Sequence, residues 1–168
     1  NSALDRVRRR AHGIGFDVEL NPFYVVGDSD MLERAVTNLL DNAVKWSPPG
    51  GTIRVQLEGD RLRVADQGPG ISESDMPFIF DRFYRGDFAR QTSGTGLGLS
   101  IVAQTMAQHG GWVKAGRSAQ GGAEFTIQLP GTTNLEALAE PSAQPATQSN
   151  PSPTPPPALA ESGRKRQG

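Results

Sequence analysis

Four polar residues in the first half of the chain recur every three or four positions: Arg34, Asn38, Asn42 and Lys45. In a helix this spacing places them on one face. Two amides one turn apart offer neutral oxygens and N–H donors, and the lysine adds a positive charge, so the set suits a hydrated Mg²⁺ ion and phosphate oxygens. The alternative is an ordinary solvated helix face. Asparagine is unfavourable inside helices, however, so two on one face call for a reason.

A second candidate site is the segment 66–71, Asp-Gln-Gly-Pro-Gly-Ile, which directly follows a predicted strand. A carboxylate at the end of a strand, here that of Asp66, can accept a hydrogen bond from an exocyclic amine of a ligand. The glycines allow a ligand to approach the backbone closely. An ordinary turn has the same composition, so this motif alone is weak.

Two further motifs follow. Segment 80–85, Phe-Asp-Arg-Phe-Tyr-Arg, carries two phenylalanines that could anchor a loop and two arginines that could reach phosphates; a hydrophobic cluster with solvated arginines fits equally well. Segment 94–99, Gly-Thr-Gly-Leu-Gly-Leu, opens into a predicted helix whose free N–H groups favour anions. It matches neither the dinucleotide-binding fingerprint nor the phosphate-loop pattern.

The elements that must position these motifs can be read from hydrophobic periodicity. We expect helices at 3–11, 28–46 (capped by Asp28) and 96–109, and strands at 16–20, 24–26, 52–58, 62–66, 112–116 and 123–129. This order predicts a two-layer α/β sandwich, in which about three helices cover one face of a mixed, mostly antiparallel sheet of about five strands.

Composition narrows the function class. The 168 residues include 17 basic and 18 acidic side chains, which give a net charge of −1. Nucleic-acid-binding domains are usually strongly basic, with a pI above about 9, so the charge argues against that class of protein. The absence of cysteine excludes disulfides and thiolate zinc sites. We expect residues 1–13 to be the end of a linker with a first helix, 14–131 to form the domain, and 132–168 to be a disordered proline-rich tail. The start at Asn1, without methionine, suggests a fragment.

Taken in order, the motifs make residues 28–130 resemble the ATP-binding catalytic domain of bacterial two-component sensor histidine kinases, which have the Bergerat fold. Segment 38–47 resembles the family's Asn box, 66–70 its first Gly box, 79–85 its Phe box, 94–99 its second Gly box and 122–130 its closing strand. The sequence of residues 46–51 and the polar tail resemble those of actinobacterial envelope-stress kinases.

The resemblance implies ATP and Mg²⁺ as cofactors. Asn42 would coordinate Mg²⁺ with help from Asn38, Lys45 would contact phosphate, and Asp66 would accept from the adenine amine. The complete set of ATP-binding residues that it implies is Asn38, Asn42, Lys45, Trp46, Asp66, Gly68, Gly70, Ile71, Arg82, Arg85, Gly94, Thr95, Gly96, Leu97, Gly98, Leu99 and Thr126. Within it, Trp46 would flank the adenine, Thr126 would help through water, and the glycines of 94–98 would hinge a lid at about 87–95 that is mobile without nucleotide.

The resemblance also implies a reaction. Related ATPases carry a glutamate where this chain has Asn38, and an amide is a poor general base, which argues against hydrolysis and favours transfer to an imidazole. Neither His12 nor His109 matches the family's acceptor motif, so the acceptor would lie on an upstream dimerisation domain, and this chain alone should not phosphorylate itself. The expected partners are that domain and a response regulator, with no nucleic acid.

The parent would be a homodimeric membrane sensor with this domain in the cytoplasm, and the chain itself a monomer. A nucleotide-binding regulatory module that never transfers phosphate is the alternative.

Overall fold

The computed structural model describes residues 2–86 and 95–139. Within them, five strands form one sheet in the order β1-β2-β3-β5-β4, in which β1 and β2 are parallel and all other neighbours are antiparallel. The strands are β1 (Gly15–Leu20), β2 (Thr52–Glu58), β3 (Arg61–Ala65), β4 (Trp112–Arg117) and β5 (Ala123–Gln128). The predicted mixed, mostly antiparallel sheet is therefore confirmed.

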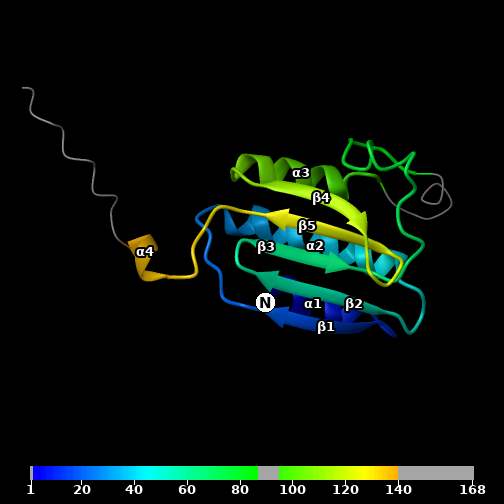
Figure 1. The fold of residues 1–168 in the computed structure, drawn as a ribbon, viewed down its shortest axis with the longest axis horizontal. Coiled ribbons are helices and arrows are strands. Elements are labelled where there is room, and N and C mark those ends of the chain that lie inside the picture. The colour runs from blue at the N-terminus through cyan, green and yellow to red at the C-terminus, as the bar shows by residue number, and fades with distance from the viewer. Residues whose placement is uncertain (1, 87–94, 140–168) are drawn as a thin grey trace, which may run out of the picture.

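Three helices cover one face of this sheet: α1 (Ser2–Arg10), α2 (Ser29–Trp46) and α3 (Gly98–Gln108). Figure 1 shows the sheet crossing in front of α1 and α2, with α3 alongside β4. A fourth helix, α4 (Glu136–Ala139), is a single turn beyond the last strand. The two-layer architecture is the predicted one. Of the described helices, none is both long enough and apolar enough to cross a bilayer.

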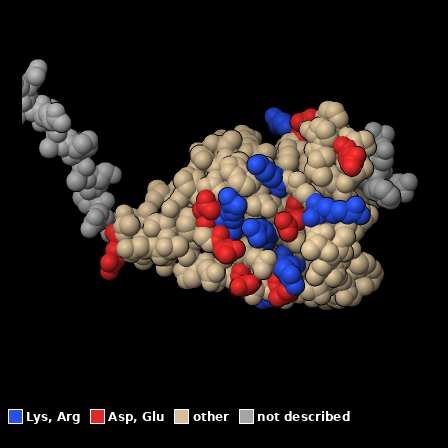
Figure 2. Space-filling view, viewed as in Figure 1, with Lys and Arg blue, Asp and Glu red and all other residues tan. Residues whose placement is uncertain are grey.

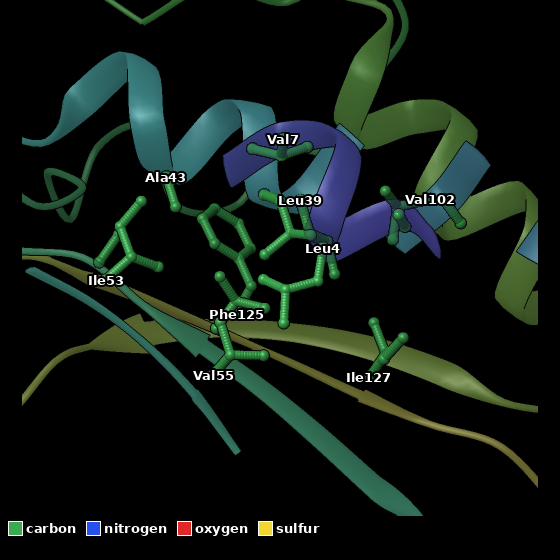
Figure 3. Close-up of a cluster of buried hydrophobic side chains, with 14 of the residues drawn as sticks. Leu4, Val7, Leu39, Ala43, Ile53, Val55, Val102, Phe125 and Ile127 are labelled. Atoms are coloured by element: carbon green, nitrogen blue, oxygen red, sulfur yellow. The ribbon is translucent and has the colours of Figure 1, made fainter. Parts of the chain in front are cut away.

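The core lies between the helices and the sheet (Figure 3). Alternate residues of β5, namely Ala123, Phe125 and Ile127, face the helices, and Leu39 and Leu40 of α2 are fully buried against them. The opposite face of the sheet is polar, and Figure 2 shows basic and acidic side chains interleaved across it. This strand alternation decides which side chains can reach a site on the helix side.

Helix α1 contributes to the same core. Val7 is completely buried, and Ala3 and Leu4 are nearly so. Arg10 and Asp41 join α1 to α2 through an ion pair at 2.6 Å. The predicted boundary at residue 13 sets α1 apart from the domain. In the structure, however, α1 packs into the same core as the rest of the domain.

We expect Val7→Ala to lower the free energy of unfolding by about 2 kcal/mol, because it deletes buried methyl groups and leaves a cavity. Urea denaturation measures this change. Arg9→Ala is the control, since Arg9 is exposed on the same helix. Equal stability of the two variants would mean that α1 is not part of the cooperative unit.

The ends of α2 and α3 are tied together. Asp28 caps α2 as predicted, since its Oδ1 accepts from the backbone N–H groups of Asp30 and Met31, each at 3.0 Å. His109, just after α3, donates from Nδ1 to the carbonyl of Thr105 at 2.7 Å and accepts at Nε2 from the N–H of Asp28 at 3.1 Å. This arrangement fixes the start of α2 against the end of α3. The end of α2 then lies beside the start of α3.

One predicted strand is wrong. Residues 24–26 contribute only an isolated antiparallel bridge between Tyr24 and Thr132, with N–H···O distances of 2.8 and 2.9 Å in the two directions. The bridge holds the chain after β5 against the segment before α2. The predicted tail beyond residue 139 lies outside the described residues.

Candidate nucleotide site

A pocket of about 550 Å³ opens between the second half of α2, the start of α3 and the segment after β3. Most of the predicted binding residues line it, although they come from distant parts of the chain. They are Asn38, Asn42, Lys45, Trp46, Asp66, Gly70, Ile71, Arg85, Thr95, Gly96, Gly98 and Leu99. The fold therefore brings residues of all four sequence motifs to one cavity.

Asp66 is the buried charge of this pocket, with 1% of its surface exposed. Its Oδ1 accepts from the backbone N–H groups of Gly68 at 2.9 Å and Ala123 at 3.0 Å. Its Oδ2 is buried and has no hydrogen-bond partner within the described protein. Burial raises the pKa of the Asp66 carboxyl, while the hydrogen bonds from Ala123 and Gly68 act in the opposite direction. One oxygen of the Asp66 carboxylate is thus held in place, and the other is open to a donor that the described residues do not supply.

Two glycines make this position of Asp66 possible. A side-chain carbon at Gly122 would overlap the backbone oxygen and Oδ1 of Asp66, and one at Gly68 would overlap the backbone oxygen of Trp46. Gly68 therefore acts by close packing around the carboxylate rather than as part of the pocket wall. Gly122 was not among the predicted residues, because its contact depends on pairing between β3 and β5.

Three of the four residues on the predicted face of α2 line the pocket, namely Asn38, Asn42 and Lys45, whereas Arg34 does not. The Nδ2 of Asn38 is buried without a protein partner among the described residues. The Oδ1 of Asn42 accepts from Nε1 of Trp46 at 3.2 Å, and Nζ of Lys45 lies 4.9 Å from the centre of the Trp46 ring. Partial burial, and secondly the charge of Arg85, lower the pKa of the Lys45 ammonium.

The start of α3 provides backbone donors at the same cavity. Gly96 has φ +70, which an L-residue rarely adopts, and helix α3 begins only at Gly98, two residues later than predicted. Leu97, at the N-cap, has no side chain that could satisfy the first free N–H groups, so these groups remain available to an anion. A side-chain carbon at Gly98 would lie 3.8 Å from the Asn38 side chain, so the two motifs lie next to each other at the pocket.

The structure places other predicted residues elsewhere. Arg82 is exposed, with its guanidinium carbon 5.9 Å from the Phe83 ring, and does not line the pocket. Thr126, predicted to help bind adenine through water, pairs between Arg63 and Lys114 on the polar face of the sheet, because its neighbour Phe125 faces the core, and it does not line the pocket. Leu97 caps α3 without lining the cavity. Gly94 and most of the predicted lid lie outside the described residues.

Several lining residues were missed. Ala123 and Phe125 of β5 face the cavity, and the alternating pattern of that strand was the signal that could have found them. Arg117 at the end of β4 also lines it, and no sequence pattern marks it. Tyr84 donates to Asp75 at 2.6 Å and connects the segment before the lid to the one after β3.

The polar side chains of the pocket suit a metal ion that binds together with another ligand and is coordinated partly by that ligand. Across residues 2–86 and 95–139, no group of three or more histidine, cysteine, aspartate or glutamate side chains could hold a metal ion. A single amide oxygen, such as Oδ1 of Asn42, suits Mg²⁺ when phosphates and water supply the other ligands, because Mg²⁺ usually keeps several waters and phosphate ligands. The orphaned Oδ2 of Asp66 and Nδ2 of Asn38 further indicate a polar ligand.

Comparison with known proteins agrees with this geometry. Residues 27–133 match the family described as histidine kinase-, DNA gyrase B-, and HSP90-like ATPase. The signal transduction histidine-protein kinase/phosphatase MprB of Mycobacterium sp. (strain KMS) is 47% identical over 138 residues, which cover 77% of this chain and 27% of that protein. The MprB of Mycolicibacterium smegmatis is 47% identical over 138 residues, covering 77% and 28%. The chain thus spans about a quarter of the length of these curated relatives.

Solved structures show the same likeness. The mycobacterial sensor histidine kinase MprB superposes with a TM-score of 0.73 at 44% identity, over 77% of this chain and 91% of that one. The ATP binding domain of PrrB from Mycobacterium tuberculosis gives 0.59 at 28% identity, over 78% and 93%. The family match spans strands β2 to β5 and all the lining residues of the pocket, and the chain belongs to the histidine kinase-, DNA gyrase B- and HSP90-like ATPase family as an ATP-binding domain of the sensor histidine kinase type.

Proposed function

We propose that the chain binds Mg-ATP in this pocket and donates the γ-phosphoryl group to a histidine on another domain of its parent protein. The observation that carries the proposal is the buried Oδ2 of Asp66, which no described protein group satisfies. A carboxylate held by two backbone N–H groups on one side and open on the other is a fixed acceptor for the exocyclic amine of adenine.

The other end of the pocket supports phosphate binding. Lys45 and Arg85 supply positive charge, and the start of α3 supplies backbone N–H groups. Asn42 would hold the Mg²⁺ ion through Oδ1, and the ion would neutralise charge on the phosphates during transfer. Asn38 lies one turn earlier on α2, where its amide can donate to phosphate but cannot act as a base.

These side chains favour transfer to an imidazole over hydrolysis. A neutral imidazole attacks phosphorus with its own lone pair, so a nitrogen–phosphorus bond forms as the bond to ADP breaks, and no base has to remove a proton first. Within the chain, both ring nitrogens of His109 are already engaged, with Thr105 and Asp28. Because His12 does not match the family's acceptor motif either, the acceptor is expected outside this chain, on an upstream dimerisation domain.

The relatives suggest the setting. Because the MprB proteins are described as signal transduction histidine-protein kinase/phosphatases, we infer that the parent is a sensor kinase that passes phosphate to a response regulator. Within that proposal the parent is a membrane-bound homodimer and this domain is its cytoplasmic, monomeric catalytic part, with no nucleic-acid partner.

Titration calorimetry of the chain with ATP and Mg²⁺, followed by mixing with the separately expressed histidine-bearing domain of the parent, tests the proposal. We expect saturable ATP binding, acid-labile phosphohistidine on the added domain, and none on this chain alone. ATP binding without phosphohistidine would favour a nucleotide-binding regulatory module, and absence of ATP binding would refute the proposed function altogether.

A further inference from the structure

Trp46 makes a contact that the proposed nucleotide chemistry does not require of it. It is the last residue of α2, one turn after Asn42, and its indole Nε1 donates to Oδ1 of Asn42 at 3.2 Å. The same ring lies under the ammonium group of Lys45, with 4.9 Å from Nζ to the ring centre. One aromatic side chain therefore contacts both Asn42, the proposed ligand of Mg²⁺, and Lys45, the proposed phosphate contact.

The hydrogen bond has a directional consequence. An indole N–H can only donate, so the group facing Trp46 must be the oxygen of the Asn42 amide and not its NH2 end. An amide without such a partner can rotate by half a turn and exchange its oxygen and nitrogen. The amide oxygen has a second lone pair, which stays free for a cation while the first accepts from the indole.

We propose that Trp46 is a positioning residue for Mg²⁺, which acts by fixing the amide orientation of Asn42 so that its oxygen is presented to the ion. This inference rests on the proposed function, because it assumes that Asn42 is the magnesium ligand. It assigns Trp46 a role that differs from flanking the adenine. Partners that orient a metal ligand typically change metal affinity by about 10- to 100-fold when they are removed.

The variant Trp46→Phe tests the proposal, because it keeps an aromatic ring beside Lys45 and removes the indole donor together with the rest of the five-membered ring. ATP affinity is measured by calorimetry in excess EDTA and again over a series of free Mg²⁺ concentrations. We expect the affinity in EDTA to stay within about twofold of wild type and the tightening by Mg²⁺ to fall by about tenfold. Direct titration with Mn²⁺, followed by its electron paramagnetic resonance signal in the presence of ATP, should show the same loss.

The chain provides a matched control. Trp112 is its other tryptophan, lies on the polar face of the sheet, and also has a lysine over its ring, with Nζ of Lys114 at 4.7 Å. Trp112→Phe removes the same atoms without touching the pocket, and it should leave both affinities unchanged. The nuclear magnetic resonance spectrum of Trp112→Phe should contain a single indole N–H resonance, that of Trp46. This resonance should move upfield when Asn42→Ala removes the hydrogen-bond acceptor.

A double-mutant cycle separates orientation from packing. In Asn42→Asp, either carboxylate oxygen can face the cation, so orientation no longer depends on a donor. Adding Trp46→Phe to Asn42→Asp should therefore cause no further loss of Mg²⁺ affinity, whereas a purely structural role would cause the same loss in both backgrounds.

Three results would overturn the inference. The first is an equal loss of ATP affinity with and without Mg²⁺, which would mean that Trp46 contacts the nucleotide directly. The second is no change in either condition. The third is an indole resonance that is insensitive to Asn42→Ala. If wild type itself failed to bind ATP, the proposed function would be refuted, and the two failures can thus be distinguished.

Discussion

Asp66→Asn should weaken ATP binding by about 10- to 150-fold, which corresponds to about 1.5–3 kcal/mol. The amide oxygen of the variant is needed on the Oδ1 side, where the N–H groups of Gly68 and Ala123 donate. The NH2 group is then forced into the Oδ2 position and faces the adenine amine, so two donors oppose each other. Rotating the amide moves the same conflict onto the two backbone donors.

The same variant should be more stable than wild type without nucleotide, by about 1 kcal/mol at pH 7, because it replaces a carboxylate whose charge is disfavoured by burial with a neutral amide. The pKa of Asp66 is raised by burial, so the folded protein takes up a proton at higher pH than the unfolded chain. Wild type therefore gains stability as the pH falls through that raised pKa, whereas asparagine does not titrate. The stability difference should shrink as the pH is lowered from 7.

Calorimetry measures the affinity and chemical denaturation at several pH values measures the stability. Asp17→Asn is the matched control, because Asp17 is exposed on the polar face of the sheet, in an ion pair with Arg54 at 2.9 Å. It should change neither ATP affinity nor the pH dependence. Unchanged ATP binding by Asp66→Asn would remove Asp66 from the site.

Much of the fold was predictable because periodicity carries it. A helix is predicted by the apolar stripe of 29–46, and a strand is predicted by the alternation of apolar residues in 123–128. Both elements form within a residue or two of the predicted bounds. The strand at 24–26 failed for lack of neighbours, since a single bridge to Thr132 is all that the surrounding chain offers. The start of α3 shifted because Gly96 takes a left-handed conformation.

The site was predictable where residue type and spacing carry the chemistry, as in the face of α2. It was not predictable where it depends on register. Thr126 was misplaced although the alternation around Phe125 and Ile127 already puts it on the other face. The contact of Gly122 with Asp66 and the hydrogen bond from Ala123 to Asp66 join residues 56 and 57 positions apart, and only the pairing of β3 with β5 reveals them.

Asn42→Ala should reduce Mg²⁺-dependent phosphoryl transfer by about a hundredfold or more, because it deletes the proposed magnesium ligand. The methyl group that remains can neither bind a cation nor accept from Trp46. ATP affinity in EDTA should change much less, since the adenine end of the pocket around Asp66 is untouched. Phosphohistidine formation on the separately expressed acceptor domain, over a range of Mg²⁺ concentrations, is the measurement.

Asn21→Ala is the matched control for this loss, because Asn21 is exposed and its backbone N–H keeps its bond to the carbonyl of Leu57. It should transfer phosphate as wild type does. Wild-type transfer that persists without any divalent cation would contradict the role of Asn42, since a ligand to an unnecessary ion cannot limit the rate. Partial recovery of Asn42→Ala at high Mg²⁺ would instead be the expected signature, because a weakened site can still be filled by mass action.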